Sequence, residues 1–342
     1  MRLLVLSHRD VLAALSPGAC FEAMTAVLAG HALGETFMPL RSVMMPPGAA
    51  GFMGLMPGWR GGPGDGTAAF ALKVVCIMPG NPGRGLDAHQ GLVTLFDGET
   101  GVPTAILDAS AVTAVRTAAV TAVATSVLAR DDARTLAILG AGTQARAHLR
   151  ALAGVRDFEQ VRVYAPTRAH AQAVVQEMAE EMARAAEPGG AARGELSVAA
   201  SAEEAVREAD VVVTVTSARE PVLRHAWLMP GAHVSAVGAS TPQARELDTD
   251  TVAASALFCD SRESLRHEAG EFRLAVAEGK IAGEEHVRAE IGEVLAGTAD
   301  GRRDPGELTL FRSLGLAIED LAAAESAVAA ATVRGIGTEV EL

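Results

Sequence analysis

The chain has 342 residues, of which 49% are hydrophobic and only 4% aromatic, and its formal net charge is −13. This length predicts about two domains, with cores built mainly from Ala, Val and Leu. The negative charge argues against nucleic acids and anionic membrane surfaces as partners, because both require clustered Lys and Arg. A small anionic ligand remains compatible with it, since a few well-placed cations suffice.

The three cysteines are far apart and lack the spacing of metal ligands: Cys20, Cys76 and Cys259. An odd number of scattered cysteines argues against a disulfide framework. Residues 1–10 lack the layout of a signal peptide, and the charge-poor runs 118–129 and 326–333 are too short to cross a bilayer. We therefore expect a soluble cytoplasmic protein that needs no metal.

The first third of the chain predicts one helix followed by short strands. Residues 17–33 have helical periodicity, with Ser16 as the N-cap and Pro17 at the first helical position. Residues 92–96 and 103–107 predict a hairpin around the turn at 97–101. Further strands are expected at residues 41–45, 52–56 and 69–77.

From residue 110 onwards, helices alternate with strands, which predicts a parallel, doubly wound sheet. The expected helices are 110–130, one starting at 145, 169–186, and an Ala-rich helix at 316–333 that returns to the first domain or serves an interface. Residues 187–194 are expected to form a surface loop. The expected strands are 135–139, 160–164, 196–199, 209–214, 233–237 and 257–260.

The segment Gly140-Ala141-Gly142-Thr143-Gln144-Ala145 lies between an apolar strand and a helix. A dinucleotide-binding turn has this order: the first glycine makes the tight turn, and the second lets the backbone approach a pyrophosphate. A small third residue then lets the helix pack on the strand. The helix N-terminus provides N–H groups and positive potential for the phosphates. We therefore predict a dinucleotide-binding turn here, although an ordinary glycine-rich turn of an unrelated α/β protein would look similar.

The end of the second strand bears on the choice between NAD and NADP. An acidic residue there commonly binds the ribose hydroxyls of NAD, but Tyr164-Ala165-Pro166-Thr167-Arg168 has none. Thr167 and Arg168 suit a 2′-phosphate, which favours NADP over NAD; the alternative is a solvated Arg168. Later strand ends, at Thr214, Ser217, Val237 and Gly238, are expected to line the cofactor crevice.

Taken together, these motifs resemble the ornithine cyclodeaminase/μ-crystallin family over nearly the whole chain. The matching stretches are Ala71-Leu72-Lys73-Val74, His89-Gln90-Gly91, Val115-Arg116-Thr117-Ala118-Ala119, residues 140–146, Arg245-Glu246-Leu247-Asp248, Asp260-Ser261-Arg262-Glu263, and Thr309-Leu310-Phe311-Arg312-Ser313-Leu314-Gly315.

The resemblance implies an α/β protein: a Rossmann domain with a doubly wound parallel sheet (126–314), and a mixed α+β domain (1–125). The latter is completed by the C-terminal helix (315–342) and serves substrate binding and homodimerisation. It further implies that Arg41, Lys73 and Arg116 bind a substrate carboxylate, and that Met56 lines the site opposite the nicotinamide.

The sequence departs from the family pattern at Ser240, in Gly238-Ala239-Ser240-Thr241-Pro242. Cyclodeaminases and alanine dehydrogenases of the family usually have an aspartate there, which binds an ammonium group or accepts a proton. Serine stays neutral at physiological pH. Ser240 therefore resembles the ketimine-reductase and μ-crystallin branch.

The chemistry of the three cations agrees with these roles but leaves alternatives open. Arg41 and Arg116 each offer a bidentate fork to a carboxylate, yet Arg41 would also suit an exposed edge strand and Arg116 a buried structural ion pair. Lys73 interrupts an apolar run, where burial would favour its neutral form and fit it for proton transfer. A lysine snorkelling to solvent is the alternative.

The sequence therefore predicts an NAD(P)H-dependent reductase of an α-imino acid, such as pyrroline- or piperideine-2-carboxylate, with Lys73 and Arg116 as its catalytic residues. Ornithine or lysine cyclodeamination and an alanine dehydrogenase-like activity remain enzymatic alternatives. A third alternative is a protein of μ-crystallin type that binds NADPH and a small ligand without turnover as its main role.

Overall fold

The computed structural model describes residues 2–62, 68–185 and 194–341, and the chain forms two compact units. The first unit comprises Met1–Ala119 and Gly315–Leu342, and the second comprises Val120–Leu314. The division falls inside helix α3 (Ala109–Leu128), earlier than the boundary after residue 125 expected from sequence. Residues 187–193 of the expected loop lie outside the described residues.

The first unit is built on a mixed sheet with the strand order β16-β1-β7-β6-β5-β4-β2, and β3 also pairs with β4. Among the described strands of this sheet, only β1 and β7 pair in parallel. The strands are β1 (Arg2–Leu6), β2 (Thr36–Phe37), β3 (Ser42–Met44), β4 (Phe52–Arg60), β5 (Ala69–Ile77), β6 (His89–Asp97), β7 (Pro103–Asp108) and β16 (Thr338–Glu341).

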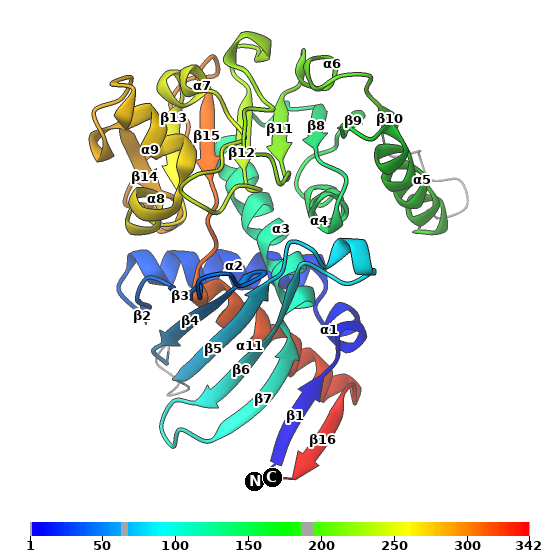
Figure 1. The fold of residues 1–342 in the computed structure, drawn as a ribbon, viewed down its shortest axis with the longest axis vertical. Helices are drawn as coiled ribbons and strands as arrows, with labels where there is room; N and C mark the ends of the chain where they lie inside the picture. Colours follow the sequence, from blue (N-terminus) through cyan, green and yellow to red (C-terminus); the bar gives the residue numbers. More distant parts are fainter. Residues whose placement is uncertain (1, 63–67, 186–193, 342) are drawn as a thin grey trace. The chain divides into compact units, whose positions relative to one another are not determined.

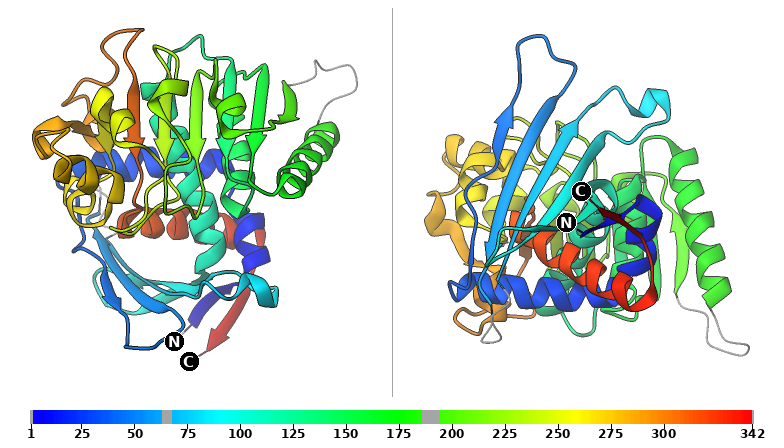
Figure 2. Two further views of the ribbon diagram at one scale, coloured as in Figure 1. Left: turned by 45° about the horizontal axis from the view of Figure 1, so that its top comes forward. Right: turned by 90° about the horizontal axis from the view of Figure 1, so that it is seen from below.

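Helix α11 (Ala317–Arg334) joins the C-terminal part of the chain to the first unit. It packs against α2 (Pro17–Ala32), α1 (His8–Ala14) and strands β4, β5 and β6. Figure 2 shows α2 and α11 side by side. Small residues permit this contact: a Cβ atom at Gly58 of β4 would lie 3.2 Å from the backbone of Ala317. Residues of α11 therefore contribute to the core beside β5.

The second unit is built on an all-parallel sheet with the order β10-β9-β8-β11-β12-β15-β13-β14. Figure 1 shows these strands side by side. The strands are β8 (Thr135–Leu139), β9 (Gln160–Tyr164), β10 (Glu195–Val198), β11 (Val211–Thr214), β12 (His233–Ala236), β13 (Ala256–Cys259), β14 (Val287–Glu290) and β15 (Thr309–Arg312).

The connections of this sheet are mostly helical. The helices are α4 (Thr143–Leu152), α5 (Arg168–Ala185), α6 (Ala202–Val206), α7 (Thr249–Ala254), α8 (Arg262–Glu268), α9 (Gly270–Ala277) and α10 (Ile291–Leu295), and the 3₁₀ turns are η2 (His225–Trp227) and η3 (Glu284–His286). The first unit has the 3₁₀ turn η1 (Pro82–Arg84).

The order of this sheet fixes where a nucleotide binds. The chain runs outward from β8 to β9 and β10, then returns to β11 on the other side of β8 and continues outward to β12. Ligands of doubly wound sheets bind at the carboxyl ends of the strands where the winding reverses. That point lies here between β8 and β11, at the glycine turn.

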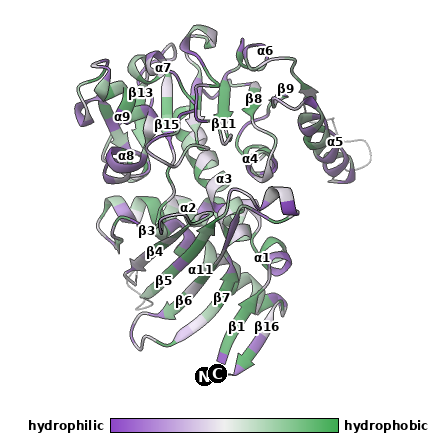
Figure 3. Cartoon of the chain, viewed as in Figure 1, coloured by the Kyte–Doolittle hydropathy of each residue, from purple (hydrophilic) through white to green (hydrophobic). Residues whose placement is uncertain are grey.

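Apolar composition explains both the parallel sheet and helix α3. Strand β11, with the sequence Val-Val-Val-Thr, is buried along its whole length, as expected for a strand covered on both faces; Figure 3 shows its hydrophobic colouring. By length and composition, helix α3 is long and apolar enough to cross a membrane, but 78% of this apolar stretch is buried inside the protein. Such burial is typical of a core helix.

The structure confirms the predicted fold class, the first helix, the hairpin and the alternation of helices and strands. It adds elements that the sequence analysis omitted: β1, α1 and β16 in the first unit together with the two-residue β2, and α6 to α10, β14 and β15 in the second. Strand β16 is exposed at every position, so it has no hydrophobic alternation by which a strand is recognised. Its pairing with β1 comes from residues more than 300 positions away in the sequence.

Candidate functional site

The glycine turn has the geometry that its sequence predicts. Gly140 has a φ of +128°, and a Cβ atom there would lie 2.6 Å from the carbonyl oxygen of Val215, so only glycine fits without strain. Ala145 is fully buried where α4 packs on the sheet. Gly142 is exposed, and a Cβ atom there would meet no protein atom within 4 Å. The space beside Gly142 is thus open to a ligand.

The start of α4 is suited to a phosphate group. Its N-cap, Gly142, makes no side-chain capping hydrogen bond, and the helix has no acidic residue in its first turn. Backbone N–H groups and the helix dipole therefore face outward next to Ala141, Thr143 and Gln144, as anion binding requires. These residues fit the pyrophosphate of a dinucleotide.

Two further predicted cofactor residues lie after β9. Thr167 and Arg168 are both exposed at the start of α5, and the Tyr164 carbonyl before them accepts a hydrogen bond from the Gly140 N–H at 2.8 Å. This bond ties the end of β9 to the glycine turn. Arg168 thus offers a guanidinium at the edge of the sheet where the turn lies.

A buried carboxylate holds the loops that follow β11 and β12. Glu246 is fully buried, and its Oε2 accepts from the Thr214 hydroxyl at 2.8 Å and from the Gly238 N–H at 2.7 Å. Its Oε1 accepts from the N–H and the hydroxyl of Thr216, at 2.6 and 2.7 Å. Burial raises the pKa of Glu246, against the lowering effect of the Thr216 hydrogen bonds. Thr214 and Gly238 are among the predicted cofactor residues, whereas no role was predicted for Glu246.

Replacing Glu246 by glutamine is expected to weaken cofactor binding and to destabilise the second unit. Donors face both carboxylate oxygens, so the amide NH₂ must oppose a donor, at a cost of about 1–3 kcal/mol of unfolding free energy. Urea denaturation and a fluorescence titration with NADPH measure both effects. Glu220→Gln, at an exposed carboxylate of the same unit, is the control; equal behaviour of the two variants would contradict this role.

Two of the predicted cations lie together in the interior of the first unit. Lys73 on β5 and Arg116 on α3 are 3% and 5% exposed, and Asp320 on α11 is fully buried. One oxygen of Asp320, Oδ1, accepts from both Lys73 Nζ and Arg116 Nε, each at 3.0 Å. Arg116 Nη1 also donates to Glu319 Oε2 at 2.8 Å. Snorkelling of Lys73 to solvent is thereby excluded.

Gly315 lies between two guanidinium groups of this unit. Its carbonyl oxygen accepts from Arg41 Nη2 at 2.9 Å. Its φ is +80°, and a Cβ atom there would lie 2.5 Å from Arg116 Nη1. The missing side chain therefore makes room for Arg116 while the backbone holds Arg41. We name Arg41, Lys73, Arg116, Glu319 and Asp320 the charged cluster.

Burial and charge set the protonation of the charged cluster. Burial, opposed by the charge of Asp320, lowers the pKa of Lys73 to about 8. Burial alone would raise the pKa of Asp320, but the charges of Arg116 and Lys73 bring it below its usual value. The charged cluster thus brings three basic side chains together with two carboxylates.

Sequence analysis missed Glu319 and Asp320. A signal was present: two adjacent acids occur in an otherwise Ala-rich helix, and buried cations need counter-charges. The structure shows Arg116 in buried ion pairs, which was the alternative to a substrate-binding role. Binding of the substrate carboxylate by the same guanidinium group stays a prediction. Met56 is buried on β4, paired in register with Lys73.

The remaining predicted residues belong to the second unit. Val237 donates its N–H to the Thr214 carbonyl at 3.0 Å, and Ser217 and Ser240 are exposed in the loops after β11 and β12. They thus follow strands at the carboxyl edge that carries the glycine turn. Among the described residues, no group of three or more His, Cys, Asp and Glu could hold a metal ion.

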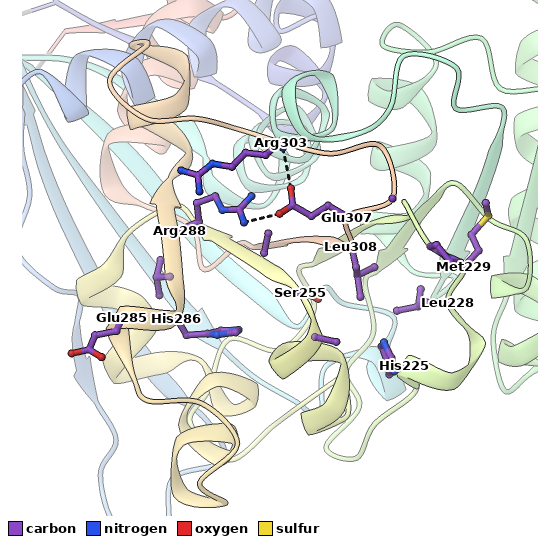
Figure 4. Close-up of a pocket in the computed structure, with 15 residues that line it drawn as sticks. His225, Leu228, Met229, Ser255, Glu285, His286, Arg288, Arg303, Glu307 and Leu308 are labelled. Carbon is purple, nitrogen blue, oxygen red and sulfur yellow. Dashed lines mark hydrogen bonds and ion pairs between the residues drawn. The ribbon is translucent and has the colours of Figure 1, made fainter.

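A pocket of about 860 Å³ lies at the amino ends of strands in the same sheet, opposite the ends that carry the glycine turn. Figure 4 shows it lined by residues that precede or begin β13, β14 and β15, among them Ser255, His286 and Leu308. Within its lining, Arg288 Nη2 and the Arg303 N–H donate to Glu307 at 2.6 and 3.0 Å. This pocket is therefore distinct from the region around the glycine turn, at the carboxyl ends of the strands.

Known proteins resemble this chain over most of its length. The ketimine reductase mu-crystallin of Mus musculus is 37% identical over 292 residues, which cover 85% of this chain and 84% of that protein. Among solved structures, Thermococcus litoralis Delta(1)-pyrroline-2-carboxylate reductase in complex with NADH and L-proline has a TM-score of 0.91 and 35% identity, covering 98% of this chain and all of that one.

A second solved structure is an archaeal alanine dehydrogenase dimer with bound NAD, with a TM-score of 0.90 and 34% identity over the whole of both chains. The model of the ornithine cyclodeaminase/mu-crystallin family matches residues 1–332. With the glycine turn and the charged cluster in place, the chain belongs to the ornithine cyclodeaminase/mu-crystallin family.

Proposed function

We propose that this protein is an NAD(P)H-dependent reductase of a small α-imino acid, such as a cyclic ketimine carboxylate. The observation that carries the proposal is the charged cluster, in which a buried lysine with a lowered pKa lies beside a buried arginine. An α-imino acid needs a cation for its carboxylate and a proton for its nitrogen, and this cluster supplies both.

The chain's own residues have separable tasks in such a reaction. Arg116 and Arg41 bind the substrate carboxylate and so orient the adjacent C=N bond. Lys73 adds charge to the carboxylate site and donates a proton, directly or through water, to the nitrogen that becomes an amine. The glycine turn and α4 hold the pyrophosphate, and the reduced nicotinamide supplies the hydride that the imine carbon receives. The overall balance is imine, NAD(P)H and a proton giving amine and NAD(P)⁺.

Ser240 supports reduction over cyclodeamination. A cyclodeaminase must bind and deprotonate a diamino acid, for which an aspartate at this position is suited, whereas a neutral serine is not. The ketimine and pyrroline-2-carboxylate reductases among the similar proteins favour the same reaction. The alanine dehydrogenase among them keeps reductive amination of an α-keto acid as the second candidate.

An assay panel tests the proposal. The protein is incubated with NADPH or NADH and pyrroline-2-carboxylate or piperideine-2-carboxylate, with pyruvate and ammonium, and with ornithine and NAD. We expect oxidation of the cofactor with the cyclic imines. Release of ammonia and proline from ornithine without net cofactor change would replace the proposal by cyclodeamination. Tight NADPH binding without turnover of any substrate would favour a binding protein.

We propose NADP as the preferred cofactor, with Arg168 at the 2′-phosphate. Replacing Arg168 by alanine is expected to raise KM for NADPH by about ten- to a hundredfold, the loss of one hydrogen bond to a charged group, and to leave KM for NADH unchanged. Arg207→Ala, at an exposed arginine after α6, is the control. A rise in both KM values, or in neither, would contradict the assignment.

Two further features are proposed for the cellular form. The three cysteines all lie in the described residues and are free, which fits a reducing cytoplasm. A homodimer is proposed by analogy with the archaeal alanine dehydrogenase dimer, and sedimentation measures it. Neither metal, nucleic acid nor membrane is required by the proposed chemistry.

A further inference from the structure

We infer that Asp320 is a positioning residue of the reductase: through one carboxylate oxygen it holds Lys73 and Arg116 together and keeps Lys73 charged for catalysis. The inference rests on the proposed function for its catalytic meaning. The placement of Lys73 itself is testable without any substrate.

The geometry identifies Asp320 as the residue shared by the two cations. Asp320 Oδ1 lies 3.0 Å from Lys73 Nζ and 3.0 Å from Arg116 Nε, so β5 and α3 are linked through α11. Glu319 differs, because it pairs with Arg116, at 2.8 Å, and the described residues show no ion pair between it and Lys73. The neighbouring acids thus provide a matched pair: Asp320 contacts both Lys73 and Arg116, whereas Glu319 contacts Arg116 and not Lys73.

In the part of the chain that the structure describes, three charged side chains influence the pKa of Lys73: Asp320, Arg116 and Arg41. Asp320 on α11 favours its ammonium form, whereas burial, Arg116 on α3 and Arg41 before β3 oppose it. Burial and, after it, the positive charge of Lys73 lower the pKa of His89 at the start of β6. Within the sheet, the register partners of Lys73 are uncharged: Met56 on β4 and Val93 on β6. Asp320 is therefore the one anion in contact with the ammonium group among the described residues.

The sequence offers an unusual means of observing Lys73 directly. The chain has only two lysines, Lys73 and Lys280. Lys280 is exposed in the second unit, where it pairs with Asp250. Protein labelled with ¹³C and ¹⁵N in lysine therefore gives two side-chain NMR signals, which Lys280→Arg assigns. The Lys280 signal then serves as the internal reference in every titration.

The test compares the titration of Lys73 in wild type, Asp320→Asn and Glu319→Gln. We expect a wild-type midpoint near pH 8. Loss of the anion in Asp320→Asn should lower it by roughly one to three pH units, and Glu319→Gln should leave it close to the wild-type value. An unchanged midpoint in Asp320→Asn, or equal shifts in both variants, would overturn the inference.

Activity provides the second arm. Because the charged form of Lys73 is the active one, kcat/KM for pyrroline-2-carboxylate should fall as the pH rises through about 8. In Asp320→Asn this fall should move to lower pH, and in Glu319→Gln it should not. Ionisation of the substrate is common to all three proteins, so a difference between them reports on Lys73.

The two proposals fail in distinguishable ways. A wild-type protein that reduces no imine, but whose Lys73 midpoint depends on Asp320, refutes the proposed function alone. If circular dichroism shows that Asp320→Asn does not fold, Asp320→Glu replaces it. That variant keeps the charge but displaces it, so the Lys73 midpoint should stay near pH 8 while kcat/KM drops about tenfold or more. Wild-type kcat/KM in Asp320→Glu would overturn the positioning role.

Discussion

Replacing Lys73 by methionine is expected to lower kcat/KM for a cyclic imino carboxylate by about 10²- to 10⁴-fold, the usual contribution of a positioned proton donor. Methionine fills a similar volume in the interior of the first unit but provides neither charge nor proton. Because Arg116 remains beside Asp320, part of the proposed carboxylate site survives. We therefore expect the loss to appear mainly in kcat, measured by initial rates of NADPH oxidation.

Lys280→Met is the matched control, since it removes the other lysine of the chain at an exposed position. Its kcat/KM should equal that of wild type. Unfolding curves of both variants establish that each is folded at the assay temperature. A Lys73→Met protein that binds NADPH normally and reduces the imine at the wild-type rate would remove Lys73 from the mechanism.

Replacing Gly142 by alanine is expected to weaken NADPH binding by about ten- to a hundredfold without loss of stability. No protein atom lies within 4 Å of the added Cβ, so the free protein accommodates it. In the complex, that methyl group stands where the backbone must approach the pyrophosphate, which costs about the energy of one charged hydrogen bond. Calorimetric titration with NADPH measures the effect.

Gly140→Ala supplies the contrast, because that glycine is required by the fold. A positive φ and a carbonyl oxygen 2.6 Å from the new Cβ should destabilise the protein by about 1–3 kcal/mol. The two variants thus separate a glycine that shapes the turn from one that leaves room for the ligand. Tight cofactor binding by a stable Gly142→Ala protein would show that the phosphate lies elsewhere.

The glycine turn was predictable because its determinants are local. Strand, turn and helix follow one another within residues 135–152, and the structure places Gly140, Gly142 and Ala145 as the motif predicts. Apolar strands of four or five residues between helices likewise predict a parallel sheet from short-range pattern alone.

The counter-charges were not predictable from local pattern, because they come from distant parts of the chain. Asp320 follows Lys73 by 247 residues and Arg116 by 204, and only the fold brings α11 beside β5. Glu246 is similar: its four hydrogen bonds reach the ends of two other strands. Two physical requirements nevertheless point to such residues: buried cations need anions that neutralise them, and N–H groups at buried strand ends need acceptors.

The central claim is that an α-imino acid held by the charged cluster receives a hydride at its Cα atom. NADPH deuterated at nicotinamide C4 tests it most directly, in a reaction with pyrroline-2-carboxylate followed by mass spectrometry and NMR of the product. The claim predicts proline with one deuterium at Cα for each cofactor oxidised on the transferred face. Proline without deuterium from either labelled face, or intact NADPH beside unreacted imine, would contradict it.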